Sequence, residues 1–179
     1  MSAGFTLFDT PLGCCGIAWS AQGITCIQLP ESSRGATVSS LLSRAGVAEV
    51  GEPPAWVVEV MHQIARHLEG GAQDLTQVRL DTARLPPFRR RVYEQARLVG
   101  PGQTVTYGEL AVLAGSPGAS RAVGQAMAKN PFPLVVPCHR VLAAGSRMGG
   151  FSAGGGVDTK ARLLALEGAS PPRGGSRNG

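Results

Sequence analysis

The sequence lacks any apolar run that approaches the about 20 residues of a membrane-spanning helix. Its first residues, MSAGFTLFDTPLG, contain no basic segment that leads into a long apolar stretch, so we expect no signal peptide and no membrane contact. Charged residues are also scarce, at 16% of the chain, whereas 43% of the residues are hydrophobic, which excludes a disordered protein. We therefore expect a folded, cytoplasmic protein.

Cysteine is sparse, and its four residues form no CxxC pair. In a reducing compartment such cysteines stay reduced, so we expect no disulfide bond. Cys14, Cys15 and Cys26 fall in predicted strands, where a thiol usually serves as a small packing group. We expect no metal, although a zinc site built from Cys14, Cys26 and a histidine stays open as an alternative.

Acidic residues are few in the second half of the chain. Residues 84–179 contain 13 Lys or Arg but only 4 Asp or Glu, a net charge of +9. Residues 1–83 contain 4 Arg and 8 acidic residues, a net charge of −4, and the two halves sum to +5. This asymmetry indicates that the second half faces a polyanion such as nucleic acid, unless it arose by chance.

The pattern predicts an α+β protein with two domains. Residues 1–83 begin with three strands in an antiparallel meander, FTLFDT, CCGIAWS and ITCIQLP, separated by glycine-containing turns. Two helices are expected next, at residues 36–46 and 53–71, and then a final strand at residues 74–81. Residues 84–168 carry mainly helix signals, and residues 169–179 are expected to form a disordered tail.

Two short helices in the second domain are typical of a helix-turn-helix. The first, TVTYGELAVLAG, contains a capping box between Thr106 and Glu109. The second, SRAVGQAMAKNP, is predicted to be capped by Ser120, and its expected packing side consists of Ala122, Val123, Ala126 and Met127. A short glycine-containing linker joins them, and in such a pair the second helix meets DNA.

The second helix has few side chains that could read base edges. Only Arg121 and Gln125 are suited to that task, while Ala122 and Gly124 are small enough to let the helix approach a nucleic-acid backbone. Arg121 stands at the helix N-terminus, where the helix dipole already attracts phosphate. We therefore predict that Arg121, Ala122, Gly124 and Gln125 bind DNA with little sequence specificity.

The segment LVVPCHRVLA contains the residues best suited to covalent chemistry. A cysteine is nucleophilic as its thiolate, so it needs a base or a positive field beside it. His139 follows Cys138, and Glu167 could orient the imidazole, which would make a Cys-His-Glu relay. On an extended chain neighbouring side chains point to opposite sides, so we expect a water molecule to link Cys138 and His139. The alternative is a packed, inert thiol.

Four stretches together resemble the O6-alkylguanine-DNA alkyltransferase family: GQTVTYGELA, RAVGQAMAKNPFPLVV, PCHRV and GGFSAGGGVDTKARLLALEG. The resemblance covers residues 84–168 strongly. It implies a small ribonuclease-H-like N-terminal domain and a helical, winged-helix-like C-terminal domain. It also implies a cofactor-free monomer that binds the minor groove of double-stranded DNA, flips O6-alkylguanine or O4-alkylthymine out, and irreversibly takes the alkyl group in a single turnover.

The resemblance also assigns catalytic roles. It makes Cys138 the alkyl acceptor, with His139 as its base through water and Glu167 as the orienting carboxylate. Asn130 would hold the Cys-His loop in shape by a hydrogen bond, instead of serving as a simple helix C-cap.

Base and DNA contacts follow from the same resemblance. Arg121 would enter the duplex and fill the space of the everted nucleotide. The hydroxyl of Tyr107 would help to rotate the phosphate and meet the guanine edge. The backbone of Cys138 and Val141, with Ser152, would recognise the flipped base, and Phe151 would form one apolar wall. The segment FSAGGGVDTK is longer and richer in glycine than in some family members.

Three other functions remain open at this point. A lesion sensor of the same fold would replace the acceptor cysteine, so Cys138 argues against it. A thiol hydrolase would use the same Cys-His-Glu relay repeatedly and would not need a basic half. A plain winged-helix DNA-binding module would leave Cys138 inert.

Overall fold

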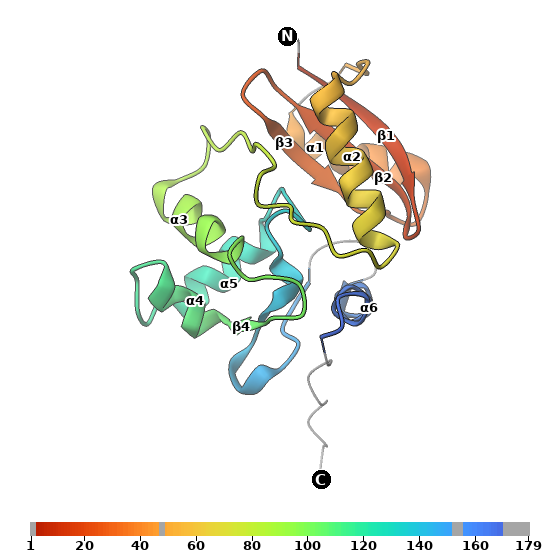
Figure 1. The fold of residues 1–179 in the computed structure, drawn as a ribbon. Coiled ribbons are helices and arrows are strands. Elements are labelled where there is room, and N and C mark those ends of the chain that lie inside the picture. Colours follow the sequence, from red (N-terminus) through yellow and green to blue (C-terminus); the bar gives the residue numbers. More distant parts are fainter. Residues whose placement is uncertain (1–2, 47–48, 152–155, 170–179) are drawn as a thin grey trace. The chain divides into compact units, whose positions relative to one another are not determined.

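The computed structural model describes residues 3–46, 49–151 and 156–169. They form two compact units: Pro131–Val135 joins the residues up to Leu85 in the first unit, and Pro86–Asn130 and Val136 onward make up most of the second (Figure 1). The boundary falls two residues beyond the predicted one, and the sequence pattern did not indicate that residues 131–135 belong with the first unit. Among the described residues no helix is both long and apolar enough to cross a membrane.

A three-stranded antiparallel sheet forms the base of the first unit, as predicted. Strand β1 (Gly4–Thr10) pairs with β2 (Gly13–Trp19), and β2 pairs with β3 (Ile24–Gln28). Short connections between the strands favour this meander, because consecutive antiparallel strands need only tight turns.

Two helices complete the first unit. Helix α1 (Arg34–Ala45) starts at Ser33, whose side chain caps the backbone, and ends at Gly46 with a left-handed φ of 66°. Leu41 of α1 joins a core cluster with Phe5, Ala18 and Cys26. Helix α2 (Ala55–Leu68) begins after a proline and buries one apolar stripe, which consists of Val57, Val60, Ile64 and Leu68.

The prediction of a strand at residues 74–81 is wrong. Only Leu80 makes a single bridge, to Ile24. The carboxylate of Asp74 accepts hydrogen bonds from the backbone N–H and the hydroxyl of Thr76, at 2.9 and 2.6 Å. Such a local side-chain turn competes with an extended backbone, so the apolar alternation here does not become a strand.

The second unit is mainly helical. It contains α3 (Pro87–Ala96), α4 (Tyr107–Leu113), α5 (Ser120–Ala128) and α6 (Gly156–Leu166). Two short strands, β4 (Val105–Thr106) and β5 (Val141–Leu142), pair in parallel. The hydroxyl of Tyr93 on α3 donates to the carbonyl of Ala126 at 2.7 Å, which ties α3 to α5.

Helix α5 differs from its prediction in two respects. Its N-cap is Ala119 with no side-chain cap, and Ser120 is the first helical residue. Ala122 was expected on the packing side but is exposed. Val123, Ala126 and Met127 form the buried stripe. At about 100° per residue, Ala122 lies about 90° from the centre of this stripe, beyond Ala126, and therefore at its exposed edge.

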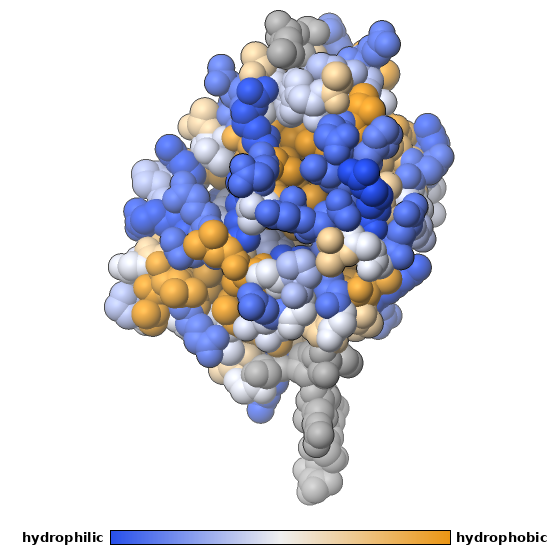
Figure 2. All heavy atoms as spheres, viewed as in Figure 1, coloured by the Kyte–Doolittle hydropathy of each residue, from blue (hydrophilic) through white to orange (hydrophobic). Residues whose placement is uncertain are grey.

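Ala169 was expected in the tail but is buried against Leu142 and Leu164; residues 170–179 lie outside the described range. On the surface of the second unit, Figure 2 shows an apolar patch over the region of α3 and α4, where Leu98, Val112 and Leu113 are exposed. None of these residues belongs to α5, whose exposed face instead consists of small and polar residues, Ser120, Arg121, Ala122, Gln125 and Ala128.

Candidate active site

Cys138 begins a single 3-10 turn, Cys138–Arg140, so the chain here is not extended, although the expectation of a water molecule between Cys138 and His139 assumed an extended chain. The backbone N–H of Cys138 donates to Val136 at 2.8 Å, and that of Arg140 donates to Pro137 at 2.9 Å. The residue is 8% exposed, and that opening faces a cavity. The turn therefore leaves the cysteine accessible from one side while the chain around it is held by hydrogen bonds.

Asn130, which follows α5, braces this turn. Its Nδ2 atom donates to the carbonyl of Val136 at 2.9 Å, and the same carbonyl accepts the N–H of Cys138. The Asn130 side chain is buried, so this bond is shielded from water. This hydrogen bond connects the end of α5 to the turn that carries Cys138.

His139 and Glu167 meet in the interior of the second unit. The Nε2 atom of His139 lies 2.7 Å from Oε1 of Glu167, and their side chains are only 1% and 2% exposed. A carboxylate accepts hydrogen bonds but cannot donate them, so Nε2 carries the proton and Nδ1 is the basic nitrogen of the neutral ring. The arrangement provides a base one residue from Cys138.

Arg140 holds the other side of Glu167. Its Nε atom donates to Oε2 at 2.9 Å and its Nη2 atom to Oε1 at 2.7 Å, a two-pronged contact. Its Nη1 atom donates to the carbonyl of Val99 at 2.7 Å. Glu167 follows the last turn of α6, so this pairing connects α6 with the turn that carries Cys138. The sequence pattern alone indicates no partner for Arg140.

The cavity beside Cys138 has a volume of about 300 Å³. Tyr107 and Phe151 contribute aromatic walls, both half-buried, and Met127 a flexible apolar one. Burial, and secondly the charge of Cys138, raise the pKa of the Tyr107 hydroxyl above its ordinary value. Tyr107 therefore keeps its proton and can donate it into the cavity.

Lys160 is a site residue that the sequence analysis missed. It is fully buried, and its Nζ atom donates to the carbonyls of Val141 at 2.8 Å and Gly150 at 3.4 Å. Burial lowers its pKa to about 8, an effect that the charge of Cys138 partly offsets. A signal existed: Lys160 shares the apolar face of α6 with Leu163 and Leu164, where a lysine is unexpected.

Of the residues assigned to base recognition, the structure describes Val141 but not Ser152. The N–H of Val141 donates to the carbonyl of Cys138, and the carbonyl of Val141 accepts from Lys160. Each carbonyl has a second lone pair with which it could accept a hydrogen bond from a base. Ser152 lies outside the described residues.

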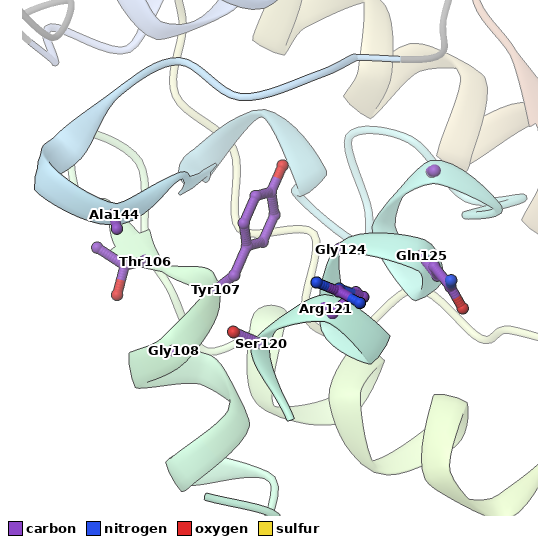
Figure 3. Close-up of a pocket in the computed structure, with 9 residues that line it drawn as sticks. Thr106, Tyr107, Gly108, Ser120, Arg121, Gly124, Gln125 and Ala144 are labelled. Carbon is purple, nitrogen blue, oxygen red and sulfur yellow. The ribbon is translucent and has the colours of Figure 1, made fainter. Parts of the chain in front are cut away.

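A wider groove of about 580 Å³ adjoins this cavity, and Tyr107, Gly124 and Ala128 line both. Figure 3 shows Tyr107 and Gly124 among the residues that line the groove. Arg121 and Gln125 line the groove from α5, and both are exposed. The predicted capping box is present: the Thr106 hydroxyl accepts from Glu109 N–H at 3.2 Å, and the Glu109 carboxylate accepts from Thr106 N–H at 3.0 Å. This box fixes the start of α4 and thus the position of Tyr107.

The other buried cysteines are chemically distinct from Cys138. Burial raises the pKa of both Cys15 and Cys26 to about 11, which keeps them protonated. Within residues 3–46, 49–151 and 156–169 no group of three His, Cys, Asp or Glu side chains could hold a metal ion, so the zinc site considered for Cys14 and Cys26 is not found there.

Residues 87–169 match the family described as "6-O-methylguanine DNA methyltransferase, DNA binding domain". The chain is 34% identical over 160 residues to the methylated-DNA–protein-cysteine methyltransferase of Methanothermobacter thermautotrophicus, which covers 89% of this chain and 82% of that relative. It is 50% identical over 80 residues to the enzyme of that name from Mycolicibacterium paratuberculosis, covering 45% and 47% of the two chains.

Solved structures show the same mixed α/β fold. Mycobacterium tuberculosis O6-methylguanine methyltransferase superposes with a TM-score of 0.72 at 29% identity and covers 94% of this chain and 95% of its own. Mycobacterium tuberculosis OGT in complex with DNA superposes with a TM-score of 0.73 at 30% identity over 92% of each chain.

Proposed function

The chain belongs to the methylated-DNA–protein-cysteine methyltransferase family, whose activity is DNA repair by alkyl transfer, and from this premise we propose that Cys138 takes the alkyl group from O6 of guanine. One observation supports this most strongly. Cys138 opens into a cavity that shares Tyr107 and Gly124 with the groove along α5, and the next residue in the same turn, His139, is paired with Glu167. A nucleophile, a base and an entrance for a nucleobase therefore meet at one place.

The proposed step uses these groups in order. The proton of the Cys138 thiol passes through a water molecule to Nδ1 of His139, whose imidazolium form Glu167 stabilises. The thiolate attacks the alkyl carbon, the bond from that carbon to O6 breaks, and its electron pair stays with guanine. Guanine takes a proton from the Tyr107 hydroxyl, and His139 restores that proton. The product is a thioether, which none of these groups can hydrolyse, so each molecule acts once.

Double-stranded DNA is the proposed partner, because a relative of the same fold was solved in complex with DNA. The alkylated atom lies inside the base stack, so the base must rotate out at a cost of a few kcal/mol. Arg121 would fill the vacated space from the minor groove, and the small residues Ala122 and Gly124 would let α5 approach the backbone. We extend the substrate range to O4-alkylthymine and propose that one monomer suffices for one lesion.

Finer descriptions of the fold belong to the same proposal. The meander β1–β3 with α1 and α2 supports a ribonuclease-H-like first domain. The helix pair α4 and α5 with the β4–β5 ladder supports a winged-helix-like second domain. A cytoplasmic location stays a prediction from the sequence.

The test is an intact-mass measurement after incubation with a duplex that contains one O6-methylguanine. We expect one protein molecule per lesion to gain the mass of one methylene unit, located on Cys138 by peptide mapping. Cys138→Ala should gain nothing, whereas Cys26→Ala should react like the wild type because Cys26 is a packing residue. An unmodified wild type, or a modified Cys138→Ala, contradicts the proposal. Repeated turnover without a stable adduct would instead favour the thiol hydrolase.

A further inference from the structure

Beyond its first turn, the exposed face of α5 carries very few side chains that can form hydrogen bonds. After the first turn of this helix, which the structure describes throughout, Gln125 is the only exposed residue with a polar side chain. Its neighbours on that face, Ala122 and Ala128, have no polar side-chain atom. The side-chain amide of Gln125 forms no hydrogen bond to any residue within the described ranges, so both its donor and its acceptor are available.

Gln125 lies one helical turn after Arg121. Residues four apart share a helix face, and both side chains line the same groove together with Tyr107 (Figure 3). Four residues advance a helix by about 6 Å, and successive base pairs are about 3.4 Å apart. If Arg121 occupies the place of the flipped nucleotide, Gln125 faces a base pair one or two steps away.

We propose that Gln125 reads the minor-groove edge of a base pair beside the lesion and favours G·C there, an inference that rests on the proposed function. In the minor groove every base pair offers N3 or O2 acceptors, but only G·C adds a donor, the guanine 2-amino group. The amide N–H₂ of Gln125 can therefore bond to any pair, whereas its carbonyl oxygen finds a partner only at G·C. The repair of identical lesions then depends on their neighbours.

Lys129 provides a control for the proposed recognition of a base pair by Gln125. It caps the end of α5, is exposed, and carries a positive charge that suits phosphate. A phosphate contact has no information about the base pair beside it, so the loss of Lys129 should slow repair of all duplexes alike. Loss of Gln125 and loss of Lys129 should therefore have different effects: the first should change the dependence of repair on the flanking base pair, and the second should not.

The experiment measures single-turnover repair rates on duplexes that differ only beside the O6-methylguanine, at positions one and two steps away. The flanking pair is G·C, A·T, or inosine·C, which keeps the pairing partner but lacks the 2-amino group. Wild type, Gln125→Ala and Lys129→Ala are compared, and each preparation is first titrated with free O6-benzylguanine to count its active molecules. The Gln125→Ala rates also report how the flanking pair itself alters base flipping.

Wild type should repair the G·C duplex about threefold to tenfold faster than the inosine·C duplex, as expected for one hydrogen bond. In Gln125→Ala this preference should be lost, leaving only the effect of the flanking pair on base flipping, and Lys129→Ala should keep the wild-type ratio. If the ratio of the G·C rate to the inosine·C rate is the same in wild type and in Gln125→Ala, the proposal that Gln125 reads the base pair is overturned. Failure of the proposed function looks different, because then wild type would form no Cys138 adduct on any duplex.

Discussion

The Nε2 atom of His139 lies 2.7 Å from Oε1 of Glu167, and Arg140 donates two hydrogen bonds to the same carboxylate. Arg140 and Glu167 balance each other's charge, so the imidazole can stay neutral without leaving an uncompensated buried charge. A neutral imidazole can take the thiol proton, and the carboxylate then stabilises the positive charge that forms. Glu167 therefore serves both the stability of the interior and the proposed chemistry.

We expect Glu167→Gln to lower both the stability of the protein and the rate of alkyl transfer. Glutamine has the same shape but no charge, so Arg140 becomes an unpaired buried cation, and breaking such a pair costs about 3–5 kcal/mol of unfolding free energy. The reaction with free O6-benzylguanine should slow by about tenfold or more, because the imidazolium loses its counter-charge. Denaturant unfolding and single-turnover rates measure the two effects.

A double variant separates the two effects of Glu167. Replacing both charges, in Arg140→Met with Glu167→Leu, should recover much of the lost stability, since apolar residues often replace a buried ion pair without a net penalty. Its reaction rate should stay low, because nothing orients His139. A Glu167→Gln protein with wild-type stability and rate would show that this carboxylate matters to neither.

Lys160 gives a prediction with a definite pH dependence. Its pKa is lowered to about 8 by burial, so it is charged below that pH and favours the Cys138 thiolate there. Lys160→Met should therefore react more slowly than wild type at neutral pH, and the difference should shrink as the pH rises through about 8. A rate ratio that does not change across this range contradicts the electrostatic role.

The stability of Lys160→Met provides a second readout. In the unfolded chain the lysine has its ordinary pKa of 10.5, so between about 8 and 10.5 the unfolded state binds more protons than the folded state. The unfolding free energy contributed by Lys160 therefore rises with pH over this window. Wild type should gain stability relative to Lys160→Met between these limits, as followed by urea unfolding at several pH values.

Lys160 also illustrates what a sequence can reveal about this site. The sequence could single out Cys138, His139 and Glu167 as candidates because PCHR and its flanking stretches are specific, and the structure pairs His139 with Glu167. The partners of Lys160 and Arg140 could not, since backbone carbonyls such as those of Val141 and Val99 have no sequence signature. Tertiary hydrogen bonds to main-chain atoms depend on how elements pack, which local patterns do not encode.

The fold was predictable where local signals agreed. The meander and the helices formed because apolar spacing, caps and turn residues favoured the same elements. The prediction of a strand at residues 74–81 was wrong because Asp74 forms a local turn. The prediction that Ala122 is buried was wrong because the packing face of α5 was taken to be one residue wider than it is. Errors of this kind concern competition between local and long-range contacts.

Gly149→Ala tests the position of Tyr107. Gly149 has a left-handed φ of 65°, and a Cβ atom there would lie 2.7 Å from the Tyr107 hydroxyl and 3.3 Å from its ring. We expect Tyr107 to be pushed out of place and the rates with both duplex and free base to fall. Gly145→Ala is the matched control, because Gly145 has a similar φ of 71° but nothing within 4 Å of the added atom. Equal rates for the two variants would mean that the placement of Tyr107 is unimportant.

Arg121→Ala separates base eversion from alkyl transfer. Arg121 is exposed and lines the groove, whereas the cavity at Cys138 is lined by other residues. A free O6-benzylguanine needs no opening of a duplex, so its reaction with Cys138 should be nearly unchanged. Repair of O6-methylguanine in duplex DNA should slow by about tenfold or more, because no side chain then fills the space of the flipped nucleotide. Single-turnover rates on both substrates decide between the two roles. If Arg121→Ala lowers both rates by the same factor, Arg121 supports the cavity and does not act as a wedge.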